Sequence, residues 1–229
     1  MGGRLSNGQC LEFDQEEYKV IPSLNINRWE AASTFIQNKI VISGGYDGRH
    51  ITDFIEVLEW DEFTHGSQWI LSPSKLPIKV RAHTLVTFND KLYVIGGEYE
   101  GFVCSDKIWE GTIDSQTNKI SWIEMALRLQ KTRFGHFSFV VSSQIIIFGG
   151  CEDEDVVEII EGNELKRGPK IPFELGAFND HAVLDRKNRI IITSNDHGLI
   201  VYDHPNRTFE HFSNLKIREM RNYSAAILQ

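Results

Sequence analysis

Short apolar runs alternate along this chain with polar turns, and four of the runs share one pattern. Each is rich in β-branched residues with hardly any polar alternation, which is typical of a strand buried on both faces. Three runs end in a glycine pair and the fourth in Ser-Asn: 40–43 before Gly44-Gly45, 92–95 before Gly96-Gly97, 145–148 before Gly149-Gly150, and 190–193 before Ser194-Asn195. The first glycines are 52 and 53 residues apart. This period predicts an array of small β units, each unable to bury its own apolar face.

Each unit is predicted to contain four short strands, of which the apolar run is the second. The first strands are expected at 31–37, 83–89, 136–142 and 181–185. The third strands are expected at 54–60, 107–113 and 156–160, and the fourth at 68–72 and 121–125. A glycine pair suits a strand that ends against neighbouring backbone, because glycine has no Cβ.

Other residue types recur at fixed distances from the glycines. A histidine stands thirteen residues before the first glycine or its replacement (His83, His136, His181), and an arginine fifteen or sixteen residues before it (Arg28, Arg81, Arg133). An apolar residue followed by aspartate comes later (Trp60-Asp61, Ile113-Asp114, Tyr202-Asp203), and a tryptophan follows in two units (Trp69, Trp122). We expect these tryptophans to fill space between neighbouring sheets.

This combination resembles the kelch repeat. Three good copies span 28–77, 81–127 and 133–170, a degenerate copy spans 178–215, and partial copies lie at 1–24 and 218–229. The resemblance implies a single all-β domain over 1–229, a kelch-type β-propeller with one four-stranded antiparallel blade per unit around a central channel. It places the glycine-pair strands near the channel and the tryptophans on outer strands. In the degenerate copy Phe178 stands where the arginine is expected.

The partial copies at the two ends allow two arrangements. Kelch propellers usually have about six blades, within the range of about 4–8 for propellers in general. Either the chain is a fragment of a larger propeller, or its two partial units combine into a closing fifth blade. The second arrangement lacks a clear second strand, so we favour the first.

The composition excludes some classes of protein. A hydrophobic content of 41% is ordinary for a folded domain, and a net charge of −8 argues against nucleic-acid and anionic-membrane surfaces. Three widely spaced cysteines, Cys10, Cys104 and Cys151, have no metal-ligand or disulfide pattern and favour a reducing compartment. There is neither a membrane-length apolar run nor a basic-then-apolar leader, so we expect a cytoplasmic or nuclear protein.

The kelch resemblance also implies where partners bind. In this family the loops between blades and those after the glycine pair share one face, which often contacts other proteins. The candidate partner-binding residues are Arg28, Arg81, Arg133, Arg221, Tyr46, His50 and Tyr99. A ring of arginines at the channel mouth would suit an acidic peptide, because guanidinium pairs with carboxylate in a bidentate fork. The competing interpretation is that the arginines bind backbone carbonyls or carboxylates of the neighbouring blade.

Catalytic and metal-binding patterns are not evident. The histidines are predicted one per blade and too dispersed to share an ion, so we interpret them as structural. The acidic run 152–155 lacks the alternating ligands and central glycine of a calcium loop. We find no nucleophile elbow, phosphate loop or zinc signature. The expectation is therefore no catalytic residue, no metal and no cofactor.

Two functions remain open. The first is a non-enzymatic module that binds a partner protein, which in this family includes substrate adaptors of ubiquitin ligases and actin-associated scaffolds. The second is a propeller enzyme of the sugar-isomerase or oxidase type, acting on a small molecule at the channel mouth. Three or more ionisable side chains converging in one deep pocket, or a bound metal, would favour the enzyme. The partner and the oligomeric state do not follow from the sequence.

Overall fold

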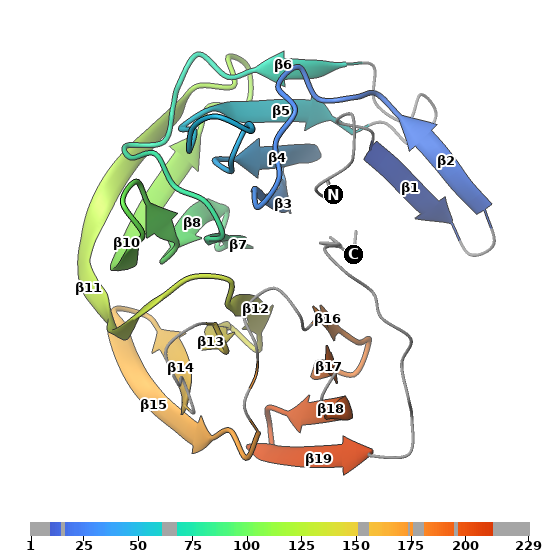
Figure 1. The fold of residues 1–229 in the computed structure, drawn as a ribbon, viewed down its shortest axis with the longest axis vertical. Helices are drawn as coiled ribbons and strands as arrows, with labels where there is room; N and C mark the ends of the chain where they lie inside the picture. The colour runs from blue at the N-terminus through green and yellow to red at the C-terminus, as the bar shows by residue number, and fades with distance from the viewer. Residues whose placement is uncertain are drawn as a thin grey trace.

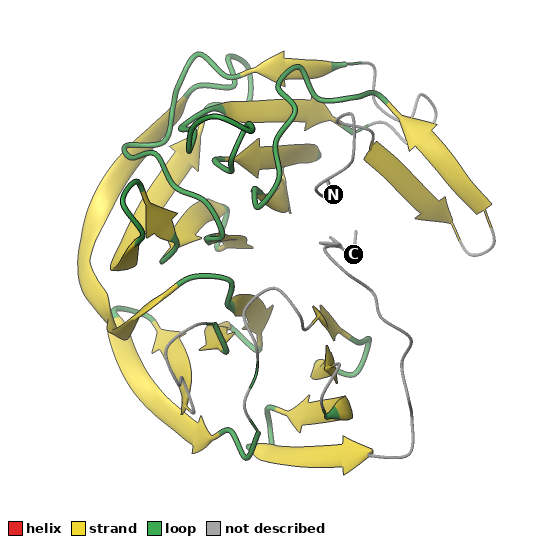
Figure 2. Cartoon of the chain, in the orientation of Figure 1, coloured by secondary structure: helices red, strands yellow, loops and turns green. Residues whose placement is uncertain are grey.

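The computed structural model describes residues 10–14, 17–60, 68–150, 156–173, 175, 181–194 and 197–212. Within these ranges the regular secondary structure consists of the strands β1 to β19. No helix in this part of the chain is long and apolar enough to cross a membrane. Four antiparallel sheets stand around a central axis as the blades of a β-propeller (Figure 1, Figure 2). The predicted all-β propeller is confirmed.

Each blade runs from an inner strand beside the channel to an outer strand at the rim. Blade 1 comprises β3 (Ala32–Ile36), β4 (Lys39–Ser43), β5 (Ile55–Glu59) and β6 (Trp69–Leu71). Blade 2 comprises β7 (Thr84–Phe88), β8 (Lys91–Ile95), β10 (Val103–Ile113) and β11 (Ile120–Arg133), with the short β9 (Glu98–Tyr99) paired to the start of β10. Blade 3 comprises β12 (Phe137–Val141), β13 (Gln144–Phe148), β14 (Val156–Glu161) and β15 (Glu164–Lys170). Blade 4 comprises β16 (His181–Leu184), β17 (Arg189–Ser194), β18 (Gly198–Asp203) and β19 (Thr208–Phe212).

The described residues include only part of the first partial copy. There, β1 (Cys10–Asp14) and β2 (Glu17–Ile21) form an antiparallel pair. The copy at 218–229 and the pair Gly2-Gly3 lie outside the described residues. So do Cys151 and the acidic run 152–155.

The fourth strands differ from the prediction in two blades. In blade 2, β11 extends to Arg133, well past the predicted end at 125, and leads directly into the next blade. In blade 3 the fourth strand, β15, has no tryptophan to mark it, and it includes Pro169. An outer edge tolerates proline because no further strand needs its missing N–H.

The turns between first and second strands explain the close alignment of the repeats. The residue pairs Gln37-Asn38, Asn89-Asp90 and Ser142-Ser143 all have φ between 48° and 63°. Two consecutive left-handed residues form a type I′ turn, whose twist matches that of the flanking strands. The turn fixes the register of β3–β4, β7–β8 and β12–β13.

The apolar core lies mainly in the seams between adjacent blades. Ile145 to Phe148 on β13 are fully buried, as their continuous apolar character predicts. One cluster joins blades 1 and 2, including Val41 and Val94, and another joins blades 3 and 4, including Phe148 and Ile192. Burial of these side chains stabilises the contact between neighbouring sheets by about 25 cal/mol per Å² of apolar surface.

The tryptophans lie on outer strands, as the resemblance implies. Trp69 on β6 is buried, and its indole N–H donates to the carbonyl of Pro22 at 2.8 Å. Trp122 on β11 lies opposite Gly111 on β10. A Cβ at Gly111 would come within 2.5 Å of the Trp122 ring, so the glycine provides the space in which the indole packs.

Candidate functional site

Two of the candidate arginines are buried inside the propeller. The guanidinium of Arg28 lies 3.2 Å from Glu56 on β5, and neither side chain is exposed. Arg133 donates from Nε to Glu158 on β14 at 2.7 Å, and it also donates to the carbonyl of Gly149 at 2.8 Å. These contacts correspond to the competing interpretation, with one difference. The carboxylate belongs to the blade that the arginine leads into.

The same two carboxylates hold the backbone that enters the blade. Glu56 accepts hydrogen bonds from the backbone N–H groups of Asn25 and Ile26, at 2.7 and 3.2 Å. Glu158 accepts one from the N–H of Gln130 at 2.6 Å. Each buried glutamate therefore ties the incoming linker to the third strand, which is a structural role.

Blade 2 fills the corresponding position with an apolar pair. The N–H of Gly45 donates to the carbonyl of Val80 at 2.8 Å, just as that of Gly97 donates to Arg133 at 2.7 Å. Val80, not Arg81, is thus the equivalent of Arg133. Trp109 stands opposite β8 where Glu158 stands opposite β13, and it packs in the same cluster as Val80.

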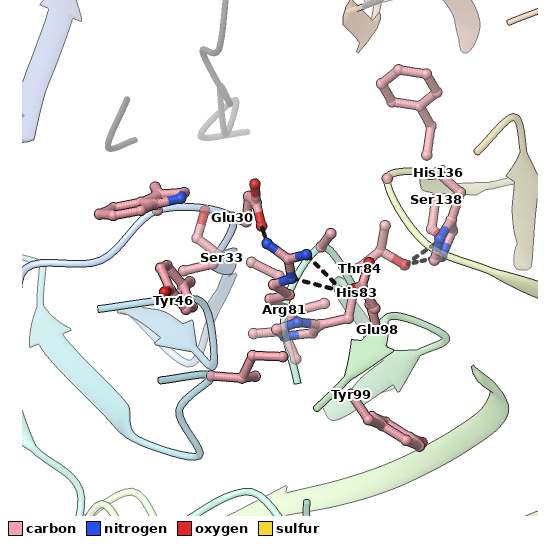
Figure 3. Close-up of a pocket in the computed structure, with 18 of the residues that line it drawn as sticks. Glu30, Ser33, Tyr46, Arg81, His83, Thr84, Glu98, Tyr99, His136 and Ser138 are labelled. Carbon is pink, nitrogen blue, oxygen red and sulfur yellow. Dashed lines mark hydrogen bonds and ion pairs between the residues drawn. The ribbon is translucent and has the colours of Figure 1, made fainter. Parts of the chain in front are cut away.

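Arg81 consequently takes a different repeat position, at the channel mouth. It pairs through its backbone with Glu98, as Trp29 pairs with Tyr46. Its Nε and Nη2 donate to Glu98 Oε1 at 3.1 and 2.6 Å, and its Nη1 donates to Glu30 Oε2 at 2.9 Å (Figure 3). Burial lowers the pKa of Arg81, but Glu98 and Glu30 outweigh this effect and raise the pKa overall.

Arg81, Glu98 and Glu30 line a pocket of about 1190 Å³ at the channel mouth, which we call the mouth pocket. The Tyr46 ring packs edge-on against Trp29 with ring centres 5.1 Å apart, and the Arg81 guanidinium lies 5.8 Å from the Tyr46 ring centre. Tyr99 also lines the pocket, and its hydroxyl is 2.6 Å from the hydroxyl of Ser105. Burial raises the pKa of Tyr99.

The structure therefore brings together four of the seven predicted site residues. Arg81, Tyr46, His50 and Tyr99 line the mouth pocket, and His50 is exposed. Arg28 and Arg133 do not line it, so the described residues contain no ring of arginines. Arg221 lies outside the described residues.

Among the residues of this pocket that sequence reasoning missed are Trp29, Glu30 and Phe102. Aligning the units strictly on their first glycines rather than on their arginines would have placed Trp29 level with Arg81, each fifteen residues before the glycine. Phe102 lies in the β9–β10 hairpin, with 82% of its surface exposed and φ of 61°. A bulky apolar residue after Gly101 in a polar turn was its sequence signal. Glu30 had none.

A chain of backbone hydrogen bonds links three blades at the mouth. The N–H of Ala82 donates to the carbonyl of Glu30, and the N–H of Gly135 donates to the carbonyl of Ala82, each at 2.8 Å. All three residues have left-handed backbone, with φ of 57°, 50° and 63° from Glu30 to Gly135. Glycine adopts this conformation without a steric cost, whereas Glu30 and Ala82 are strained there.

Two of the recurring histidines link blade 2 to blade 1 and blade 3 to blade 2. His83 Nε2 lies 2.9 Å from the Ser43 hydroxyl, and His136 Nε2 lies 3.1 Å from the Thr84 hydroxyl. Burial, with a smaller contribution from a nearby arginine, lowers the pKa of each imidazole to about 3. Both rings are uncharged at neutral pH and act as structural cross-links. The described residues include no cluster of three His, Cys, Asp or Glu side chains that could hold a metal.

Comparison with known proteins supports the fold and the repeat type. Over 81 residues, or 35% of this chain, the sequence is 31% identical to the F-box/kelch-repeat protein At1g51550 of Arabidopsis thaliana, of which it covers 17%. Over 133 residues, or 55% of this chain, it is 25% identical to the Rho GTPase-activating protein gacHH of Dictyostelium discoideum, of which it covers 8%. The chain thus spans less than a fifth of the length of either relative. No family model matches.

The fold is also similar to a solved structure, that of YjhT. The TM-score is 0.70 with 11% sequence identity, and the match covers 87% of this chain and 69% of the other. At this identity the likeness shows the fold alone. Together, the sequence match to a kelch-repeat protein and the propeller architecture fit a kelch-type propeller.

Proposed function

We propose that this chain is a protein-interaction module that binds a segment of a partner protein at the mouth of its channel. The observation that carries the proposal is the composition of the mouth pocket. Trp29, Tyr46, Tyr99 and Arg81 line it beside the highly exposed Phe102. Aromatic residues and arginine supply most of the binding energy in protein interfaces, and an exposed phenylalanine is a suitable anchor.

The rigidity of the pocket also supports this role. Its residues lie on the inner strands of the blades and on the loops beside them. Backbone hydrogen bonds between Arg81 and Glu98, of 3.0 and 2.9 Å, tie the β9–β10 hairpin to the linker before blade 2. A surface that is already ordered loses less conformational entropy when a partner binds. In a longer protein, such a module would serve as a substrate adaptor for a ubiquitin ligase or as a cytoskeletal scaffold, in the cytoplasm or nucleus. The name of the Arabidopsis relative, which couples an F-box with kelch repeats, favours the adaptor.

One observation favours the enzyme as a second candidate. Three ionisable side chains, Glu30, Arg81 and Glu98, converge in the mouth pocket. We rank this function second because these groups bind one another, and because His83 and His136, with pKa values of about 3, are weak proton acceptors at neutral pH. Turnover of a monosaccharide by the purified protein, lost in Glu98→Gln, would establish the enzyme.

Replacing Phe102 tests the interaction module. Partners captured by the tagged protein in cells should be lost from Phe102→Ala and retained by Ile123→Ala. The matched control changes a side chain that is 68% exposed on the outer strand β11, away from the mouth pocket. Circular dichroism should show both variants folded. Equal capture by wild type and Phe102→Ala would contradict the proposal.

A further inference from the structure

We infer that the channel mouth holds a site for a cationic side chain, in which Arg81 is an internal occupant, and that the partner segment is basic rather than acidic. This inference rests on the proposed function, because it names the chemistry of the partner at the same pocket. It reverses the acidic peptide that a ring of arginines would suit.

The Arg81 guanidinium is surrounded by groups of the kind that bind a cationic ligand. Carboxylates from two different blades accept hydrogen bonds from all three of its nitrogens, and the Tyr46 ring lies beside it. Paired carboxylates with an aromatic ring are the environment that stabilises a guanidinium or ammonium group. The Arg81 side chain remains 20% exposed and the Glu30 side chain 24% exposed, so the cluster can be reached from the channel.

The repeat shows that the blade architecture does not require an arginine at this position. At the same position the other two described units carry aromatic residues, Trp29 and Phe134. The buried arginine that locks blades 1 and 3 is replaced in blade 2 by Val80, with Trp109 in place of the glutamate. Arg81 is therefore additional to the blade lock, and its contacts are confined to the mouth.

The charge around the site favours a cation over an anion. The mouth pocket is lined by the carboxylates of Glu30, Glu98 and Glu100 and by the guanidinium groups of Arg49 and Arg81, and Lys79 lies 3.7 Å from Glu100. At the Arg81 position itself, the charged groups that an incoming side chain would meet are the carboxylates of Glu30 and Glu98. His83 and His136, which also line the pocket, are uncharged at neutral pH. An incoming carboxylate would have to displace Glu98 or Glu30 from Arg81, whereas an incoming guanidinium would replace Arg81 on partners that already bind that group.

Titration with short peptides tests the inference directly. The probe is acetyl-Gly-Arg-Gly-amide, its neutral counterpart contains citrulline, and its anionic counterpart contains glutamate. Arg81→Ala empties the site, and Arg81→Met keeps it filled by an uncharged chain of similar length. Because an internal competitor lowers apparent affinity by the fraction of time that the site is open, the arginine peptide should bind Arg81→Ala about tenfold more tightly than wild type. Arg81→Met should show no such gain.

The citrulline peptide should bind none of the three proteins, and adding Glu98→Gln to Arg81→Ala should abolish the gain. Glu164→Gln, which changes an exposed carboxylate on the outer strand β15, is the matched control and should leave it unchanged. Equal binding of the arginine and citrulline peptides would overturn the inference. So would tighter binding of the glutamate peptide than of the arginine peptide to wild type, a comparison that needs no variant to fold. The Phe102 experiment is independent, so a module that keeps its partner dependence on Phe102 but fails here would lose only the basic specificity.

Discussion

The glycine that ends the second strand of a blade has no room for a side chain. A Cβ on Gly96 would come within 2.7 Å of the Arg133 carbonyl oxygen and 2.8 Å of the His136 ring. Arg133 is the last residue of β11, and His136 lies in the connection between β11 and β12. Gly162, in the β14–β15 turn, has the same φ of +60°, but no atom lies within 4 Å of the place that its Cβ would take. Comparing the two positions distinguishes the effect of steric contact from that of backbone strain, because both have the strained φ but only Gly96 has close neighbours.

We predict that Gly96→Ala destabilises the protein by about 3 kcal/mol or more, because it combines left-handed strain with collision against rigid backbone. Gly162→Ala should cost only about 1 kcal/mol, since strain acts there alone. Urea unfolding of the two variants measures both values. Equal losses of unfolding free energy in the two variants would show that the residues around Gly96 can move to accommodate a methyl group.

Single residues also show where sequence reasoning succeeded and where it failed. The glycine pairs and histidines were predictable because backbone geometry and burial require them in each unit. A structural role for Arg28 and Arg133 was one of two interpretations of the sequence, but their carboxylate partners could not be named, because Glu56 and Glu158 lie more than twenty residues away on the third strand. Arg81 was wrongly aligned with Arg28 and Arg133. It lies fifteen residues before the first glycine of its unit rather than sixteen, but it is also an arginine, so the one-residue difference was not noticed.

At the scale of elements, the linkers before blades 1, 2 and 3 are fixed either by an ion pair or by apolar packing. Arg133 and Glu158 are each about 1% exposed, whereas Val80 and Trp109 fill the same position in blade 2 without charge. Breaking a buried ion pair leaves one uncompensated charge, while replacing both partners by apolar side chains is often tolerated.

We predict that Arg133→Val alone costs about 3–5 kcal/mol of unfolding free energy. The double variant Arg133→Val, Glu158→Trp, which copies blade 2, should recover part of that loss. Lys166→Met, in an exposed ion pair on β15, should change stability by less than about 1 kcal/mol. If the double variant loses more unfolding free energy than the two single variants lose together, apolar packing cannot replace the ion pair at this position.

The strands themselves were predicted well where a marker residue was present. Glycine pairs, type I′ turns and tryptophans located the strands of blades 1 and 2 to within a few residues, except for β11, which continues from its predicted end at 125 to Arg133. The fourth strand of blade 3 was missed because β15 carries no tryptophan, and Pro169 argued against a strand there. An outer edge imposes few demands on sequence, so its strands leave the weakest pattern.

For the whole molecule, the buried histidines make the contacts between blades sensitive to acid. In the unfolded chain a histidine has its ordinary pKa near 6.5, but in the folded protein the pKa of His83 and of His136 is about 3. Between these values the unfolded state binds protons that the folded state does not. Their contribution to stability is therefore complete above pH 6.5 and declines as the pH falls toward 3.

We predict that lowering the pH from 7 to 5 costs about 2 kcal/mol for each of these two histidines. Urea unfolding at the two pH values should show the loss in wild type, and His136→Gln should show a smaller one. His50→Gln, at an exposed position, should retain the wild-type dependence. An unchanged dependence in His136→Gln would show that other groups control the acid response.

The backbone chain from Glu30 through Ala82 to Gly135 has a mechanical consequence. Ala82 accepts a hydrogen bond from one neighbouring blade and donates one to the other, so it cannot shift without moving both. A ligand that separates Glu30 from Arg81 would also pull on the peptide group of Ala82, which is hydrogen-bonded to Glu30. The displacement would then pass to Gly135, which is hydrogen-bonded to Ala82. We therefore expect blades 1, 2 and 3 to shift together at the mouth, although each is a separate repeat unit in the sequence.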